Sequence, residues 1–157
     1  MDKLIRGHKD MKQPSPPRAP HDTPTPNKVL LVPLTTSKAA LLHPFIPRLS
    51  ALLHDLNGRA EPDHRVRVRV AVHAGEVIHG PHGWIGTDLN LACRLVDSTP
   101  LRQELIRRPQ ADLALIVSEV IHRAVVQHGH RGVDPASYRP VHIAVKEVVT
   151  PAWMRTH

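Results

Sequence analysis

Residues 65–97 read RVRVRVAVHAGEVIHGPHGWIGTDLNLACRLVD, and this stretch decides the fold. Valine occupies every second position from 66 to 72, and this period of two predicts a strand over Arg65–Val72. The glycines at positions 80, 83 and 86 predict a loop or short hairpin after the strand. A helix then follows, capped by Thr87 and running to about Val96. We expect this helix to turn Leu89, Ala92 and Leu95 inward.

Three arginines alternate with the valines of the predicted strand, at positions 65, 67 and 69. Their side chains therefore share the face opposite the valines. We interpret this face as a solvated surface, with contact to a phosphate group as the alternative.

Before the central stretch, the sequence predicts a tail, a strand and a helix. Residues 1–27 contain six prolines and predict a disordered tail, which leaves 28–157 as the folded domain. The apolar run Val29–Val32 predicts a short buried strand. Apolar residues from Leu42 to Leu56 recur at helical spacing and predict a helix with a core face, whose regular part begins around Pro44–Pro47 and ends at Asn57-Gly58.

After the central stretch, the sequence predicts two helices and two strands. A short helix opens at Pro100 and ends near Pro109, and Leu113–Val117 is a buried strand. Ser118 and Glu119 start a helix that lasts until Gly129, and its inward positions are Val120, Ile121, Ala124 and Val125. A closing strand covers Tyr138–Val149, with Pro151 and Trp153 after it. This order predicts an α/β fold, a ferredoxin-like sandwich with a mixed sheet and helices on one face.

Composition narrows the classes of function. The formal net charge is +7, but residues 1–28 carry six Lys or Arg against three Asp, so the predicted folded part is only mildly basic. With 3% aromatic residues for base stacking, nucleic-acid binding is disfavoured. The single cysteine excludes an intrachain disulfide, and no apolar run is long enough for a membrane span, so we expect a cytoplasmic protein. His128 and His130 are interpreted as a solvated loop and not as a metal site.

Four segments together resemble the class III nucleotide (adenylate/guanylate) cyclase homology domain, over roughly Val29 to Val149. Residues 86–94 read GTDLNLACR, similar to the family's Gly-x-x-Val-Asn-x-Ala-x-Arg helix. The preceding His73-Ala74-Gly75 matches its His-x-Gly turn, and LALIVSEVIHRAVV and VHIAVKE resemble its later strands. The resemblance implies that Asn90 and Arg94 stabilise charge on a phosphoryl group, and that Gly86 and Thr87 belong to the same nucleotide-binding site.

Asn90 and Arg94 also suit a phosphate by their own chemistry. They lie four residues apart, so on a helix both side chains share one face and can reach one ligand. A guanidinium beside an amide donor is suited to charge developing on a phosphoryl group. The alternative is that Arg94 pairs with Asp97 or Asp88 and that Asn90 is an ordinary surface position.

The family's metal site has no counterpart in this sequence. Active members hold two metal ions with two aspartates, one on a first core strand and one on a hairpin before the strand that Val29–Val32 would match. At the position of the hairpin aspartate the chain has Pro26-Asn27-Lys28. We therefore expect no metal or other cofactor, with Mg²⁺ or Mn²⁺ bound only if a partner chain supplies the aspartates. Gly83 stands where many members carry a base-selecting Asp, so no base is assigned.

These features predict a degenerate cyclase-homology domain, incomplete relative to the full family domain and without cyclase activity on its own. Its expected role is a nucleotide-binding or regulatory module in intracellular signalling. One alternative is a subunit of an active cyclase, because sites of this family form between two chains, and a homodimer or heterodimer would then be required. The other is an unrelated α/β protein-interaction domain.

Overall fold

The computed structural model describes residues 27–145 and 148–157. The chain divides into two units, Met1–Leu30 and Leu31–His157, of which the second holds all the helices and strands described below. The predicted disordered tail lies outside the described residues except for Asn27, and the same holds for Lys146 and Glu147 of the VHIAVKE segment.

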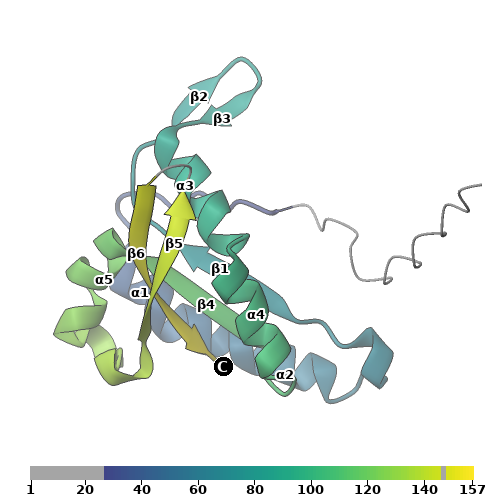
Figure 1. Ribbon diagram of the computed structural model, residues 1–157. Coiled ribbons are helices and arrows are strands. Elements are labelled where there is room, and N and C mark those ends of the chain that lie inside the picture. Colours follow the sequence, from purple (N-terminus) through teal and green to yellow (C-terminus); the bar gives the residue numbers. More distant parts are fainter. Residues whose placement is uncertain (1–26, 146–147) are drawn as a thin grey trace, which may run out of the picture. The chain divides into compact units, whose positions relative to one another are not determined.

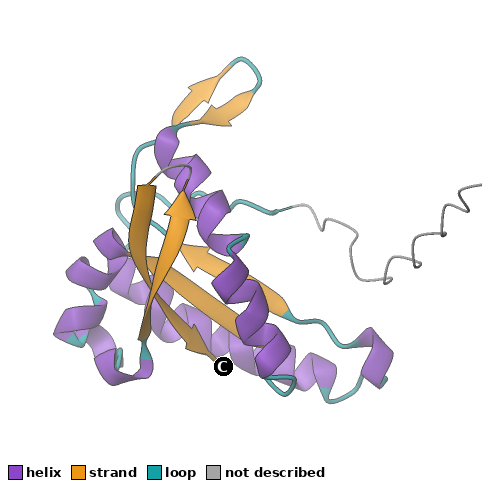
Figure 2. Cartoon of the chain, viewed as in Figure 1, coloured by secondary structure: helices purple, strands orange, loops and turns teal. Residues whose placement is uncertain are grey.

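Four strands form a mixed sheet in the order β1-β4-β6-β5 (Figure 1). β1 (Val68–Val72) runs parallel to β4 (Leu113–Ser118), with Val70 opposite Leu115. β6 (Val148–Thr156) is antiparallel to both β4 and β5 (Arg139–Val145). A separate hairpin, β2 (Ile78–Gly80) and β3 (Gly83–Ile85), projects away from this sheet (Figure 2). The α/β class and the mixed sheet are thus as predicted.

Helices cover both faces of the sheet, so the prediction of helices on one face was wrong. The side chains of Leu113, Leu115 and Val117 pack on one face with α2 (Ile46–Asn57) and α5 (Glu119–Ala124). Ala114 and Ile116 point to the other face and pack with α3 (Thr87–Val96) and α4 (Thr99–Arg107). Every residue of β4 is buried, as expected for a strand with neighbours on both edges and a layer on each face.

The run Val29–Val32 is not a strand, which corrects the sequence prediction. It is irregular backbone, and the exposed fractions of Val29 and Leu30 are 54% and 73%. A short apolar run becomes a β-strand only when a partner strand accepts and donates its backbone hydrogen bonds. Within the described chain, no strand pairs with Val29–Val32. The match of Pro26-Asn27-Lys28 to the family's hairpin aspartate was based on a strand at Val29–Val32. Because that strand is absent, the match has no structural support.

The predicted first helix is present, with less of it buried than expected. α1 (Lys38–Ala40) and the turn Leu41–Phe45, kinked at His43, lead into α2, which ends at Asn57 with Gly58 as its C-cap. Ile46 and Leu53 are buried against the sheet. Phe45, Leu52 and Leu56 of the same apolar pattern are exposed, by 44%, 67% and 54%. Only one side of the pattern is therefore core.

The C-terminal third departs most from prediction. The predicted strand Tyr138–Val149 is really the hairpin β5–β6, and β6 is an inner strand that carries Pro151 and Trp153. Pro140 and Pro151 disguised these strands, because proline cannot donate to a ladder. α5 is shorter than expected, and short helical turns at Val126–His128, His130–Gly132 and Pro135–Ser137 follow it. Ile121 and Val125 are buried as predicted, whereas Val120 and Ala124 are exposed.

The remaining turn, Pro62–His64, lies between α2 and β1. No helix of the described chain is long and apolar enough to cross a membrane.

Candidate functional site

The candidate site lies on α3, whose first turn is placed by Gly86. A Cβ at this position would lie 2.9 Å from the carbonyl oxygen of Glu76, closer than real Cβ contacts come. Glycine is therefore needed because two loop segments meet here without room for a side chain. Gly86 is also the N-cap residue, so Thr87 is the first residue of the helix and not its cap, which corrects the prediction. Thr87 is exposed beside it.

Asn90 and Arg94 are both exposed and lie one turn apart on α3. The backbone N–H of Asn90 donates to the carbonyl of Gly86 in the first turn of the helix. Within the described residues, neither side chain has a hydrogen-bond or ion-pair partner. The helix thus presents a guanidinium and an amide together, both ready to meet a ligand from outside.

The pairing of Arg94 with Asp97 or Asp88, considered as the alternative from the sequence, does not form. Asp97 lies 3.7 Å from guanidinium nitrogens of both Arg69 and Arg102. Asp88 is held by the backbone and by His73. The positive charge of Arg94 is therefore not neutralised by either acid.

A polar cluster that sequence reasoning missed fixes the start of α3. The ring of His73 lies with Nδ1 2.8 Å from Ser118 Oγ and Nε2 3.2 Å from Asp88 Oδ1. The backbone N–H of Glu76 donates to Asp88 Oδ2 at 2.8 Å. These contacts join the end of β1, the end of β4 and the first turn of α3. The His73 side chain is only 6% exposed, so its ring serves to hold these segments together, whereas the Asp88 side chain is 39% exposed.

The turn after β1 needs glycine at position 75 because the side chain of Asp88 packs against it. A Cβ on Gly75 would lie 2.1 Å from the Asp88 carboxyl carbon, so the carboxylate occupies the space that a side chain would need. The backbone hydrogen bond from Glu76 and then the hydrogen bond with His73 lower the pKa of Asp88. The only sequence signal for this role was an acid in the first turn of a helix, where the helix dipole favours it.

The three arginines of the predicted strand Arg65–Val72 have structural partners. Only Arg69 lies in β1, because the strand begins at Val68 and not at Arg65. Arg67 donates to the carbonyl oxygens of Ala111 at 2.9 Å, Arg108 at 2.7 Å and Leu105, and so satisfies the end of α4. Arg65 pairs with Asp112 at 2.8 Å. Arg69 lies beside Asp97, so each of the three arginines contacts another part of the chain. These contacts argue against a phosphate site on this face, and they also correct the prediction of a solvated surface.

The described residues include no group of three or more His, Cys, Asp or Glu side chains that could hold a metal ion. His128 and His130 are exposed on the loop after α5, as predicted. Two shallow hollows lie on the surface of the described chain, and neither Asn90 nor Arg94 lines either of them.

Comparison with protein-family models, with curated proteins and with solved structures finds no match to this chain.

Proposed function

We propose that this chain is a degenerate class III cyclase-like domain, ferredoxin-like and incomplete, that binds the phosphates of a nucleoside triphosphate through Asn90 and Arg94. We further propose that it does not cyclise the nucleotide on its own and acts as a binding or regulatory module in signalling. The observation that carries the proposal is the guanidinium of Arg94, which has no ion-pair partner among the described residues and lies beside Asn90 on an exposed helix face.

The support comes in three parts. The residues GTDLNLACR resemble the family's transition-state helix, and in the structure they form a helix with that motif's Asn and Arg on one exposed face. Gly86, the first residue of the motif, is required by close backbone approach. The His73 cluster ties this helix to the ends of two sheet strands, so its position is rigid.

The chemistry assigned to the site is binding and orientation. The guanidinium offers paired N–H donors in a fixed plane and keeps its charge at all working pH values, so it suits phosphate oxygens. The amide of Asn90 adds a neutral donor one turn away. Cyclisation would also need divalent metal to position the 3′-hydroxyl and the α-phosphate. In this proposal Mg²⁺ or Mn²⁺ enters only with aspartates from a second cyclase-like chain, in a homodimer or a heterodimer.

The test is turnover of ATP, GTP, CTP and UTP by the purified chain in Mg²⁺ and in Mn²⁺, with nucleotide binding measured on the same sample. Saturable binding without cyclic product is the expected result. Cyclic product from the lone chain would overturn the non-catalytic assignment, and product only after a cyclase-like partner is added would instead identify a subunit of an active enzyme. If no nucleotide binds, the assignment of Asn90 and Arg94 fails.

A second candidate is a protein-interaction domain, and one observation favours it. Phe45, Leu52 and Leu56 expose large apolar surface along a single helical stripe. Such a stripe at helical spacing suits contact with another protein. Failure of nucleotide binding together with self-association lost on Leu52→Glu would support this candidate.

A further inference from the structure

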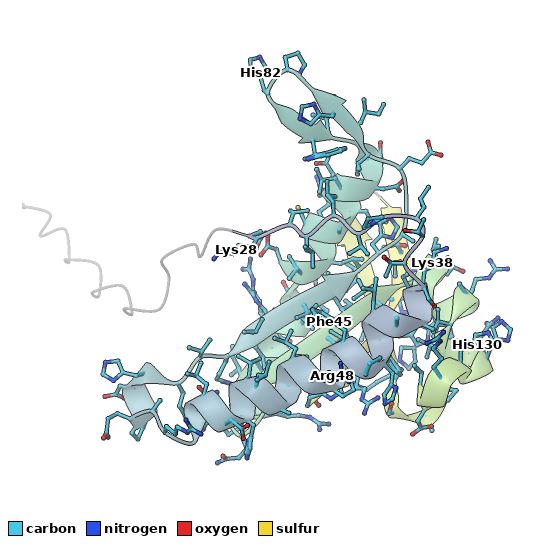
Figure 3. All side chains as sticks on the ribbon, turned by 180° about the vertical axis from the view of Figure 1, so that it is seen from behind. Lys28, Lys38, Phe45, Arg48, His82 and His130 are labelled. Carbon is cyan, nitrogen blue, oxygen red and sulfur yellow. The ribbon has the colours of Figure 1, made fainter. Side chains whose placement is uncertain are left out.

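A second surface, separate from α3, combines a hollow with positive charge. The hollow has a volume of about 410 Å³. It lies where the start of α1, the end of α5 and the loop before β5 meet, and Figure 3 shows Lys38 and His130 on two of these segments. The side chains that matter are Ser37 and Lys38 from the first segment, Ala124 and Val125 from the second, and His130 and Arg131 from the third.

The charges around the hollow are of one sign. Lys38 and Arg131 are exposed cations, and His130 adds at least one ring N–H donor. No carboxylate lines the hollow, and within the part of the chain that the structure describes Lys38 and Arg131 have no ion-pair partner. Two like charges brought to one concave surface repel each other unless an anion lies between them.

The backbone at Arg131 is strained. Its φ and ψ are 54° and 35°, and among the described residues no other non-glycine has a positive φ. The neighbours at 129 and 132 are glycines with φ of 61° and 78°, so this loop already uses glycine where the chain turns left-handed. An arginine in this region carries a steric cost, between its Cβ and the following carbonyl oxygen, that a glycine would avoid. Backbone strain of this kind is concentrated at binding and catalytic sites, so the loop is a place to look for a ligand.

We propose that this hollow binds the phosphate group of a small molecule, with Lys38 and Arg131 neutralising its charge and Ser37 and His130 adding hydrogen bonds. The guanidinium of Arg131 suits a tetrahedral oxyanion because it offers parallel N–H donors. The hydroxyl of Ser37 and the ring of His130 supply neutral partners for the remaining oxygens. The site is independent of Asn90 and Arg94 and stands whether or not α3 binds a nucleotide.

The experiment is a titration of the isotope-labelled chain with inorganic phosphate and with glucose 6-phosphate, followed by amide chemical shifts. Sodium chloride at matched ionic strength is the reference. Saturable shifts confined to residues 37–40, 124–125 and 129–133 are expected. Tighter binding of the ester than of inorganic phosphate identifies a phosphorylated small molecule, and equal binding identifies free phosphate. Shifts that also appear with chloride, or that spread without saturation, overturn the proposal.

The deciding variant is Arg131→Gly. It removes the guanidinium and relieves the left-handed strain, so we expect the melting temperature to rise while phosphate affinity falls about tenfold or more. Lys38→Gln should also weaken binding without changing the loop. Arg123→Ala is the matched control, because Arg123 is an exposed α5 arginine paired with Glu119 and does not line the hollow. Unchanged phosphate affinity in both Arg131→Gly and Lys38→Gln would overturn the site.

Discussion

Asp88 Oδ1 lies 3.2 Å from Nε2 of His73, and this contact links the first turn of α3 to the end of β1. The helix that carries Asn90 and Arg94 is therefore anchored at the end where its motif begins. Because Asn90 and Arg94 are on the exposed side of the same helix, they can change without disturbing the anchor. Anchor and proposed binding surface can be tested separately.

Arg94→Ala should weaken nucleoside triphosphate binding about tenfold or more and leave stability within about 0.5 kcal/mol of the parent chain. The reason is that Arg94 is exposed and has no ion-pair partner in the described chain. Isothermal titration and thermal unfolding of the same samples measure the two quantities. A normal affinity in the variant would remove Arg94 from the site. Arg102→Ala is the control, since Arg102 is an exposed arginine near the end of α3, 3.7 Å from Asp97.

Arg67→Ala should behave in the opposite way and destabilise the fold without a specific effect on nucleotide affinity. Its guanidinium satisfies carbonyl oxygens at the end of α4, and removing it leaves those acceptors without their donor. A loss of about 1–3 kcal/mol in the free energy of unfolding is expected from urea denaturation. If stability stays unchanged, the end of α4 does not depend on Arg67.

Asp112→Ala should be more damaging than either arginine change. The Asp112 side chain is 4% exposed and accepts hydrogen bonds from Asn57 at 2.7 Å and Arg65 at 2.8 Å. Removing it leaves the partly buried Arg65 guanidinium without its carboxylate and takes one hydrogen bond from the Asn57 amide, which keeps its bonds to the backbone of Val66. Breaking a buried ion pair in this way costs about 3–5 kcal/mol. Asp134→Ala, at an exposed acid, is a suitable comparison and should cost much less.

The stability of the fold should fall between neutral and mildly acid pH. Burial, and then the charge of Arg155, lower the pKa of His157 from 6.5 to about 4. Because the folded state resists protonation of this ring, its contribution is complete above about pH 6.5 and is lost as the pH falls towards 4. Unfolding by urea at pH 7 and at pH 5 should show the loss. In His157→Phe the difference between the two pH values should shrink, and an undiminished difference would assign the effect to other groups.

Asp88 adds a second pH dependence at lower values. The backbone hydrogen bond from Glu76 and then the contact with His73 depress its pKa, so its stabilising effect is present above the ordinary carboxyl value of 3.8 and is lost as the pH falls through the depressed value. Asp88→Asn should remove this part of the acid dependence. If the acid limb of the stability curve is the same in Asp88→Asn, the anchor does not act through the carboxylate charge.

Local patterns in the sequence predicted those helices and strands whose apolar residues recur with a regular period. The valine alternation predicted β1, although the strand begins at Val68 and not at Arg65, and helical spacing with Asn57-Gly58 predicted the end of α2. The pairing of the strands depends on contacts between distant residues, so no local pattern could place β6 beside β4. The layer on each face of β4 was readable from the sequence, because a run that is apolar at every position is typical of a strand covered on both faces, and the prediction of helices on one face overlooked this signal.

In the candidate site, too, the sequence predicted the residues related by local spacing and missed those related by contacts between distant segments. Asn90 and Arg94 were predictable because helical spacing alone places them on one face. The anchoring role of Asp88 was not, because its partners His73 and Ser118 come from two different strand ends. The roles of Arg65 and Arg67 were hidden for the same reason, since their acceptors Asp112 and Ala111 lie 47 and 44 residues further along the chain.

The complete enclosure of β4 has a consequence for how the chain folds and opens. Its strand neighbour β1 precedes it by the hairpin, α3 and α4, so the parallel pairing of Val70 with Leu115 cannot form until that whole intervening segment has closed into a loop. Once formed, the amide hydrogens of β4 have a strand on either edge and helices above and below, and they reach solvent only when the molecule opens as a whole. The slowest-exchanging protons should therefore lie in Leu113–Ser118, and their exchange rate would report the global stability of the domain.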